Sequence, residues 1–155
     1  NMPPTPITIY ADGGCLGNPG LMFHAYVVLD RDMIWLNHVG HTEIGTNNQC
    51  EYVAIIKALE AFLDVEVTAG WHGTNVNLYS DSKLVINQIK GKNLVTAPHL
   101  QQLRFDAQKL ILKLRERGWN IDFHWVSRTN PWIEVCDKMI KDAEHAYRQE
   151  NGRST

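Results

Sequence analysis

Hydrophobic and polar residues alternate over residues 5–12, and this period of two predicts a β-strand with one buried face. The strand ends at Asp12, which runs directly into the glycine-rich stretch 13–20. Glycine allows the backbone to turn, or to pass close to a bound group, without a side chain in the way. We therefore expect this strand to carry a carboxylate to a glycine turn.

Two further apolar runs follow, over residues 23–29 and 33–39, and a polar link of turn size joins them at residues 30–32. Such a link between two strand-like runs favours a hairpin. The first three strands are therefore predicted to form an antiparallel meander.

The period lengthens to that of a helix after the cap-type residues 46–48. The remaining predicted elements are a helix over 52–63, a strand over 76–80, a helix over 83–89, a helix from Pro98 to Gly118, a strand over 121–126 and a helix after Pro131. This order favours an α/β protein with a mixed sheet, in which the strand over 76–80 lies parallel to the first strand. We predict one domain over residues 1–155.

The composition agrees with one globular domain, since 44% of the 155 residues are hydrophobic and 21% are charged. The apolar runs are too short for a membrane span, and the first residues lack the pattern of a signal peptide. Three cysteines without close spacing favour reduced thiols over a disulfide framework. We expect a cytoplasmic protein with no membrane partner, and we expect it to be a monomer.

Charge is distributed unevenly, although the net charge is only −2. Residues 1–80 hold two basic and eight acidic residues, whereas residues 81–155 hold thirteen basic and nine acidic ones. This asymmetry suits a phosphate-facing surface in the second half, rich in basic residues over 83–117, and a cation-holding site elsewhere. The alternative is that these lysines and arginines form the solvated face of a helix.

Four acidic residues stand where they can share a site: Asp12, Glu51, Asp81 and Asp137. Each also has a structural alternative, respectively a turn former, the second half of a capping box with Asn48, an N-cap, and an ordinary acid at the border of core and solvent. Glu51, however, lies on the helical stripe that should face the sheet, where a carboxylate needs compensation.

The structural alternatives do not explain why the four acids can converge. Asp12 and Asp81 end strands that we expect to be neighbours, whereas Glu51 and Asp137 lie in the opening turns of helices that pack on the sheet. Clustered carboxylates repel one another unless a cation lies among them. Oxygen ligands select a hard ion such as Mg²⁺ or Mn²⁺, and a four-acid cluster suits two such ions acting on a phosphodiester.

Four short segments occur in order along the chain: DGGCLGNPG at 12–20, TNNQCE at 46–51, YSDS at 79–82 and CD at 136–137. In content, order and spacing they resemble the four motifs of type 1 ribonuclease H, and the resemblance runs from about Ile7 to Ala146. One glycine-rich acidic motif would be a weak signal, but four in order are a strong one. The resemblance implies a ribonuclease H-like fold, with a five-stranded mixed sheet flanked by helices.

The resemblance also implies an endonuclease that cuts the RNA strand of an RNA/DNA hybrid with two Mg²⁺ ions, which Mn²⁺ can replace, leaving 3′-hydroxyl and 5′-phosphate ends. Asp12, Glu51, Asp81 and Asp137 would be its catalytic, metal-binding carboxylates. The implied substrate-binding residues are Gly13, Asn18, Thr46, Asn47, Asn48, Gln49 and Ser82. Small amide side chains suit this task, because the 2′-hydroxyl in the minor groove is the direct handle that distinguishes RNA from DNA.

The chain departs from the family pattern in three places. Ser127 stands ten residues before the last acid, where many members carry a histidine that helps product leave; Arg128 and Glu134 are candidates for part of that role. Lys83 stands two residues after the third acid, where glutamine is common. The segment 90–98 passes directly between two helices, so we expect a short form without the extra basic helix of some bacterial members.

Several aromatic side chains are interpreted as structural. We expect Trp35, Trp119 and Trp125 to pack in or beside the core and His124 to be a partly buried sheet residue. Trp71 lies in a polar stretch and is expected to be free to touch nucleic acid.

Two other classes of function remain open at this point. A non-catalytic nucleic-acid-binding module on the same fold is expected to have lost at least one acid, and none is lost here. A DNA-acting nuclease of the transposase or junction-resolving kind would share the metals and the chemistry. The asparagine-rich minor-groove positions argue against it.

Overall fold

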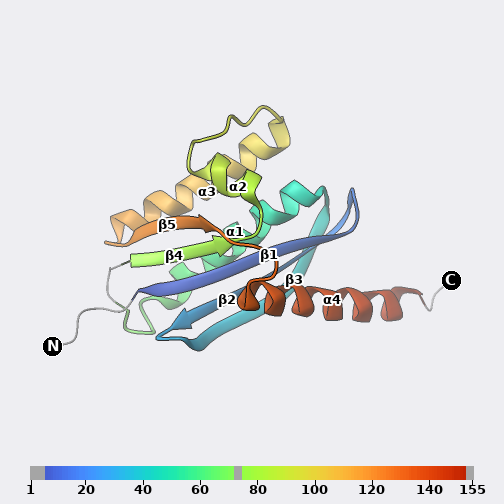
Figure 1. The fold of residues 1–155 in the computed structure, drawn as a ribbon, viewed down its shortest axis with the longest axis horizontal. Coiled ribbons are helices and arrows are strands. Elements are labelled where there is room, and N and C mark those ends of the chain that lie inside the picture. The colour runs from blue at the N-terminus through green and yellow to red at the C-terminus, as the bar shows by residue number, and fades with distance from the viewer. Residues whose placement is uncertain (1–5, 72–74, 153–155) are drawn as a thin grey trace.

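The computed structural model describes residues 6–71 and 75–152, which form a sheet with helices on both faces (Figure 1). The elements are β1 (Ile7–Gly17), β2 (Gly20–Asp30), β3 (Met33–Gly45), α1 (Asn47–Val65), β4 (Asn75–Ser80), α2 (Lys83–Ile89), α3 (Pro98–Glu116), β5 (Asn120–Trp125) and α4 (Pro131–Gly152). The predicted class and element order are confirmed. The expectations for Thr5 and for the first four residues lie outside the described residues.

The sheet has five strands in the order β3-β2-β1-β4-β5. β1, β2 and β3 pair in antiparallel fashion, whereas β4 pairs in parallel with both β1 and β5. The antiparallel meander, the mixed sheet and the parallel placement of β4 beside β1 are therefore confirmed.

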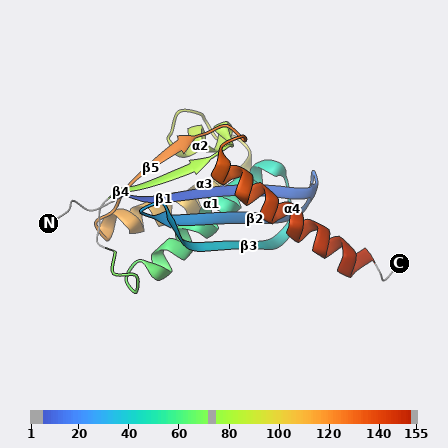
Figure 2. The same ribbon diagram turned by 60° about the horizontal axis from the view of Figure 1, so that its bottom comes forward.

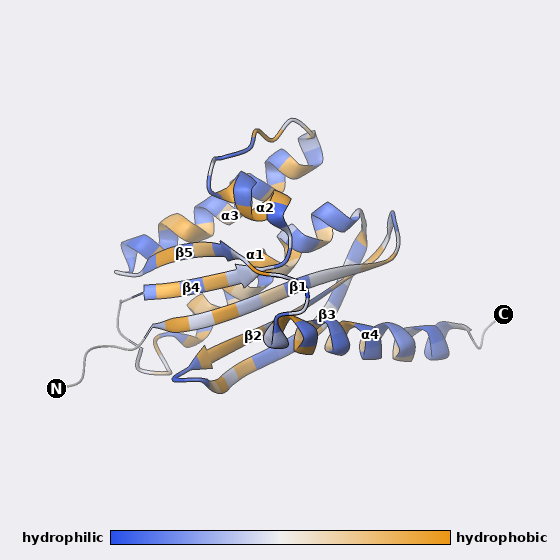
Figure 3. Ribbon diagram, in the orientation of Figure 1, coloured by the Kyte–Doolittle hydropathy of each residue, from blue (hydrophilic) through white to orange (hydrophobic). Residues whose placement is uncertain are grey.

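Two hydrophobic clusters cover the two faces of the sheet (Figures 2 and 3). Tyr26 and Val28 of β2 face the larger cluster, which also contains residues from α1, α2 and α3. Val27 and Leu29 point to the other face, where α4 packs with Cys136 and Ile140. This alternation is the period of two that places successive strand residues on opposite faces.

The glycine-rich stretch is a strand and not the turn that the sequence predicted at Gly13 and Gly14. β1 continues to Gly17, and the hairpin turns at residues 18–19, between the paired glycines Gly17 and Gly20. Gly13 and Gly14 pair with His24 and Phe23 of β2, and a Cβ at Gly13 would lie 2.5 Å from the carbonyl oxygen of Cys50 in α1. The glycine is needed there for the close approach of a helix and not for a reversal of the chain.

The β2–β3 hairpin turns at Arg31 and Asp32, which both have positive φ (55° and 63°). Two central residues with positive φ match the twist of the flanking strands. β3 then runs six residues beyond the predicted end at Val39, to Gly45. β3 lies at the edge of the sheet and pairs with β2 alone. Its last residues can therefore form a strand without the alternation of apolar and polar residues that the prediction relied on.

The tryptophans follow the expectations only in part. Trp119 is buried, as predicted, whereas Trp125 is 50% exposed and lies outside the core. Trp35 is 53% exposed, and its ring contacts that of Trp71, which packs against the core. The expectation that Trp71 is free was wrong, because its ring stacks on Phe62 at 5.5 Å and its Nε1 donates to Asp30.

His24 of β2 is a buried base, with 4% of its surface exposed. Its Nδ1 has no hydrogen-bond partner within the described part of the chain. Burial, followed by the nearby His38 and Lys57, lowers the pKa of His24 from 6.5 to about 4. The imidazole is therefore neutral in the folded protein at neutral pH.

This depressed pKa predicts a loss of stability in acid. Between about pH 6.5 and pH 4 the unfolded chain binds a proton at His24 that the folded chain does not, so the free energy of unfolding falls as the pH falls. We expect this group to contribute a loss on the order of 2 kcal/mol. Urea unfolding at pH 7, 5 and 4 should show a smaller acid loss for His24→Gln, and identical pH profiles for the two proteins would contradict the assignment.

Candidate active site

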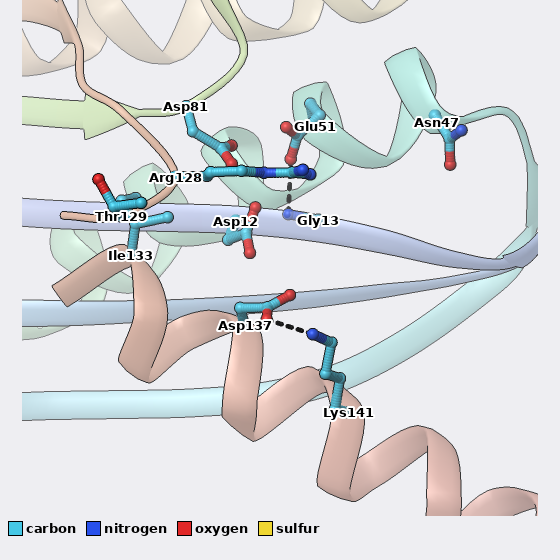
Figure 4. Close-up of a pocket in the computed structure, with 10 residues that line it drawn as sticks. All are labelled: Asp12, Gly13, Asn47, Glu51, Asp81, Arg128, Thr129, Ile133, Asp137 and Lys141. Atoms are coloured by element: carbon cyan, nitrogen blue, oxygen red, sulfur yellow. Dashed lines mark hydrogen bonds and ion pairs between the residues drawn. The ribbon is translucent and has the colours of Figure 1, made fainter. Parts of the chain in front are cut away.

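Three acids from separate elements meet above the sheet. Asp12 lies on β1, Glu51 on α1, and Asp81 directly after β4, and carboxylate oxygens of the three lie within 4.8 Å of one another. Figure 4 shows the three side chains converging on one pocket. The predicted convergence of these three acids is therefore seen in the structure.

Strand register accounts for the meeting of Asp12 and Asp81. Tyr10 of β1 lies opposite Tyr79 of β4 in the parallel pair, and the two rings stack with centroids 5.0 Å apart. Each acid follows its tyrosine by two residues. Parallel strands end at the same edge of a sheet, so both carboxylates emerge together.

The helix caps use other residues, which leaves the acids free of capping roles. Thr46 Oγ1 accepts from the Gln49 amide, and Gln49 Oε1 accepts from the Thr46 amide, so the capping box of α1 does not involve Glu51. The N-cap of α2 is Ser82, not Asp81. Two structural alternatives from the sequence are thereby wrong, for the simple reason that a neighbouring side chain fills each cap.

The acid cluster is electrostatically unfavourable on its own. Burial raises the pKa of Asp12 to about 8, and the charges of Asp81 and Asp137 add to the rise. Burial likewise raises the pKa of Glu51 well above its usual value, with Asp12 as the next contribution. Asp81 Oδ1 is buried without a hydrogen-bond partner among the described residues. Clustered oxygens short of donors fit a hard divalent cation, which would compensate their charge.

One donor is already fixed within the cluster. The Gly13 amide donates to Glu51 Oε1 at 2.6 Å, across the close contact between β1 and α1. This hydrogen bond holds the Glu51 side chain toward Asp12. Gly13 therefore shapes the cluster through its backbone.

Asp137 lies on the far side of the same pocket, which has a volume of about 610 Å³. It comes from α4 and is about half exposed, at the border of core and solvent as the sequence suggested. Its Oδ2 lies 2.8 Å from Lys141 Nζ, one helical turn later. Asp137 is thus near the three-acid cluster but held by a lysine, a pairing that the sequence reading did not consider.

Some of the predicted substrate-binding residues line a pocket, and the others do not. Gly13 and Asn47 line the main pocket, and Asn47, Asn48 and Ser82 line a shallower pocket of about 410 Å³ beside it. Asn18 lines neither pocket; its Oδ1 accepts from the Asn47 amide at 3.0 Å, so it holds the start of α1.

Thr46 and Gln49 also lie outside both pockets. Their side chains engage each other's backbone in the capping box, so the Gln49 amide oxygen already has a partner. The Gln49 NH₂ group and the Thr46 hydroxyl hydrogen are the donors that these residues could still offer to a substrate.

The loop between β5 and α4 supplies pocket residues that the sequence indicated only weakly. Arg128 lines both pockets, and Figure 4 shows its side chain extending across the main pocket. Ser127, ten residues before Asp137, is exposed and hydrogen-bonds Thr129 at 2.9 Å. His124 is half-buried and stacks on Tyr79 at 4.8 Å, which confirms its structural reading.

The basic residues over 83–117 include some that are exposed and at least one that holds two helices together. Lys90 and Lys92 are exposed near the link between α2 and α3, where residues 91–97 form no helix. Arg104, in contrast, donates from Nε to the Gln88 carbonyl at 3.0 Å and ties α3 to α2. The two lysines remain available for phosphate groups, whereas Arg104 has a packing role.

Comparison with known proteins shows the family of the chain. The sequence model of the family described as RNase H matches residues 4–144. The chain belongs to the RNase H family. RNase H1 from the archaeon Halobacterium salinarum superposes with a TM-score of 0.78 at 28% identity, covering 92% of this chain and 99% of that one. LC11-RNase H1, solved in complex with an RNA/DNA hybrid, gives 0.73 at 28% identity, covering 88% and 98%.

Some relatives in the RNase H family are considerably longer. A bifunctional protein of Mycobacterium tuberculosis is 34% identical over 145 residues, which are 92% of this chain but 36% of that protein. The chain thus spans about a third of the length of such relatives. None of the described helices combines the length and apolar composition that a membrane span requires.

Proposed function

We propose that the chain is a ribonuclease H that hydrolyses the RNA strand of RNA/DNA hybrids. The observation that carries this proposal is the meeting of Asp12, Glu51 and Asp81, with oxygens within 4.8 Å, in a pocket of a domain of this family. All four family acids are present, which favours an active enzyme over a non-catalytic binding module. The relative solved with an RNA/DNA hybrid supports the same substrate class.

The acid residues would hold divalent cations, Mg²⁺ by preference with Mn²⁺ as a substitute. Asp12, Glu51 and Asp81 would supply the primary oxygens, and Asp137, which now pairs with Lys141, would complete the set. The chemistry that two such ions supply is activation of the attacking water and stabilisation of the leaving 3′ oxygen, an in-line displacement that leaves 3′-hydroxyl and 5′-phosphate ends. Gly13 keeps Glu51 aligned throughout through its backbone amide.

The shallow pocket beside the acids would read the hybrid. Asn47, Asn48 and Ser82 line it and offer short polar side chains. A 2′-hydroxyl can both donate to and accept from such groups, and DNA lacks it. Arg128 borders both pockets and would contact a phosphate of the bound hybrid.

Cleavage of four labelled substrates tests this proposal: an RNA/DNA hybrid, an RNA duplex, a DNA duplex and single-stranded RNA. We expect cleavage of the hybrid alone, in its RNA strand, with Mg²⁺ or Mn²⁺ and not in excess chelator. Cyclic phosphate ends would exclude the two-ion mechanism. Cleavage of the DNA duplex would favour the DNA-acting alternative, and binding without cleavage would favour the non-catalytic module.

Hydrogen bonds to the sugar and ionic contacts to phosphate should differ in how strongly hybrid binding depends on salt concentration. Asn48→Ala should reduce hybrid cleavage by losing a hydrogen bond worth on the order of 1 kcal/mol, with an unchanged salt slope. Lys90→Ala with Lys92→Ala should weaken binding of all duplexes alike and flatten the salt slope, because phosphate contacts carry charge but no sequence or sugar identity. Binding measured at several salt concentrations distinguishes the two, and the reverse pattern would overturn the assignment.

A further inference from the structure

Two cysteines face each other beside the acid cluster. Cys15 of β1 and Cys50 in the first turn of α1 are 35 residues apart in sequence, but their Sγ atoms lie 3.3 Å apart. Both thiols are free, as is Cys136. Cys15 is partly exposed, whereas Cys50 is fully buried. An oxidant can therefore reach one thiol, and the other lies in contact behind it.

We propose that Cys15 and Cys50 are a redox modification site that closes to an intramolecular disulfide. A disulfide bond is about 2.05 Å long, so the sulfur atoms must approach by roughly 1.3 Å. The pairing is selective, because the third thiol, Cys136, is buried on α4 with its Sγ directed at the Tyr10 carbonyl.

The chemistry balances with hydrogen peroxide as the oxidant. The Cys15 thiol gives a sulfenic acid and one water, and the Cys50 sulfur then attacks that sulfur, releasing a second water as the S–S bond forms. The two thiols lose two electrons and two protons in total, and hydrogen peroxide takes them up as its O–O bond is cleaved to give the two waters. Burial raises the pKa of both thiols, so little thiolate is present at neutral pH and the reaction is slow.

Closure would disturb the neighbouring acid site. The Cys50 S–H donates to the Gly14 carbonyl at 3.0 Å and to the Phe23 carbonyl at 3.4 Å, and a disulfide removes that hydrogen. Cys50 directly precedes Glu51, whose carboxylate accepts the Gly13 amide at 2.6 Å. A shift of about 1 Å at a catalytic group can cost up to about 100-fold in rate. Oxidation is therefore expected to lower hybrid cleavage at least about tenfold, an effect that rests on the proposed function.

Mass spectrometry of the oxidised protein tests the site without reference to activity. After incubation with hydrogen peroxide, digestion without reductant should yield linked peptides containing Cys15 and Cys50, with the loss of two hydrogens. Cys15→Ser should not form the link, and the matched control Cys136→Ser should form it fully. The absence of this link, or links through Cys136 or between molecules, would overturn the proposal.

Activity of the same samples tests the consequence for the acid cluster. We expect the oxidised parent and the oxidised Cys136→Ser protein to lose hybrid cleavage and to regain it with dithiothreitol, whereas Cys15→Ser keeps its rate. A linked protein with unchanged cleavage would overturn the coupling to the acid cluster. A reduced parent that never cleaves the hybrid would instead refute the proposed function, while the peptide link would still report on the thiols.

Discussion

Asp12→Asn and Asp81→Asn are each expected to abolish hybrid cleavage, with a loss on the order of 10³-fold, the scale of removing one electrostatic stabiliser of a transition state. The metal-free variants should nevertheless remain folded, with an equal or slightly higher melting temperature than the parent. The reason is that each substitution puts a neutral amide of the same shape in place of a carboxyl whose ionisation the neighbouring acids oppose. Cleavage rates with Mg²⁺ and thermal melting with chelator measure the two effects.

Asp142→Asn provides the matched control for both measurements. Asp142 lies on the same helix as Asp137, but it is 68% exposed and pairs with Lys138. A surface pair of this kind contributes little to stability, so the control should keep both its rate and its melting temperature. An Asp81→Asn protein that cuts at the parental rate would mean that Asp81 has no part in the chemistry.

Gly13→Ala should also lower hybrid cleavage strongly, although it changes no polar side chain. A Cβ at this position would lie 2.5 Å from the Cys50 carbonyl oxygen and 3.0 Å from the Glu51 amide nitrogen, both backbone atoms of α1. The helix must move away, which breaks the hydrogen bond from the Gly13 amide to Glu51. We expect cleavage to fall about 10²-fold and the free energy of unfolding to fall by roughly 1–3 kcal/mol.

Gly14→Ala is the control for Gly13→Ala, since it introduces the same methyl group one residue later in the same strand. Its Cβ would meet the Ile140 Cγ2 at 3.2 Å and the Glu144 Oε2 at 3.9 Å, which are ends of side chains that can adjust. Rates and urea unfolding of the two variants should therefore differ clearly. Equal behaviour would show that the close approach of α1 at Gly13 does not matter.

The sequence was sufficient for features that depend on local patterns. The stripe that includes Glu51 places it toward the sheet, and the order of elements makes β4 parallel to β1, so the meeting of Asp12, Glu51 and Asp81 could be predicted. The start of α4 was also readable, because Asn130 Oδ1 accepts from the Trp132 and Ile133 amides.

The particular contacts that several residues make in the folded chain could not be predicted. The glycines at 13 and 14 suggested a turn, whereas Gly13 lies in β1 and its amide donates to Glu51, 38 residues later. The ion pair that holds Asp137 depends on Lys141, whose spacing fits equally well with a solvated helix face. Arg128, in the β5–α4 loop, borders both pockets together with Asp81, which follows β4, a neighbourhood that no local pattern in the sequence indicates.

The most direct test of the central claim is an anomalous difference map from crystals of the protein soaked in Mn²⁺. The claim is that Asp12, Glu51 and Asp81 form a divalent-metal site at which RNA is cut. The account predicts an anomalous peak bonded to Asp12 and at least one of the other two acids, at a Mn²⁺ concentration that supports hybrid cleavage. A map with no peak at this cluster, under conditions in which the same protein cleaves the hybrid, would contradict it.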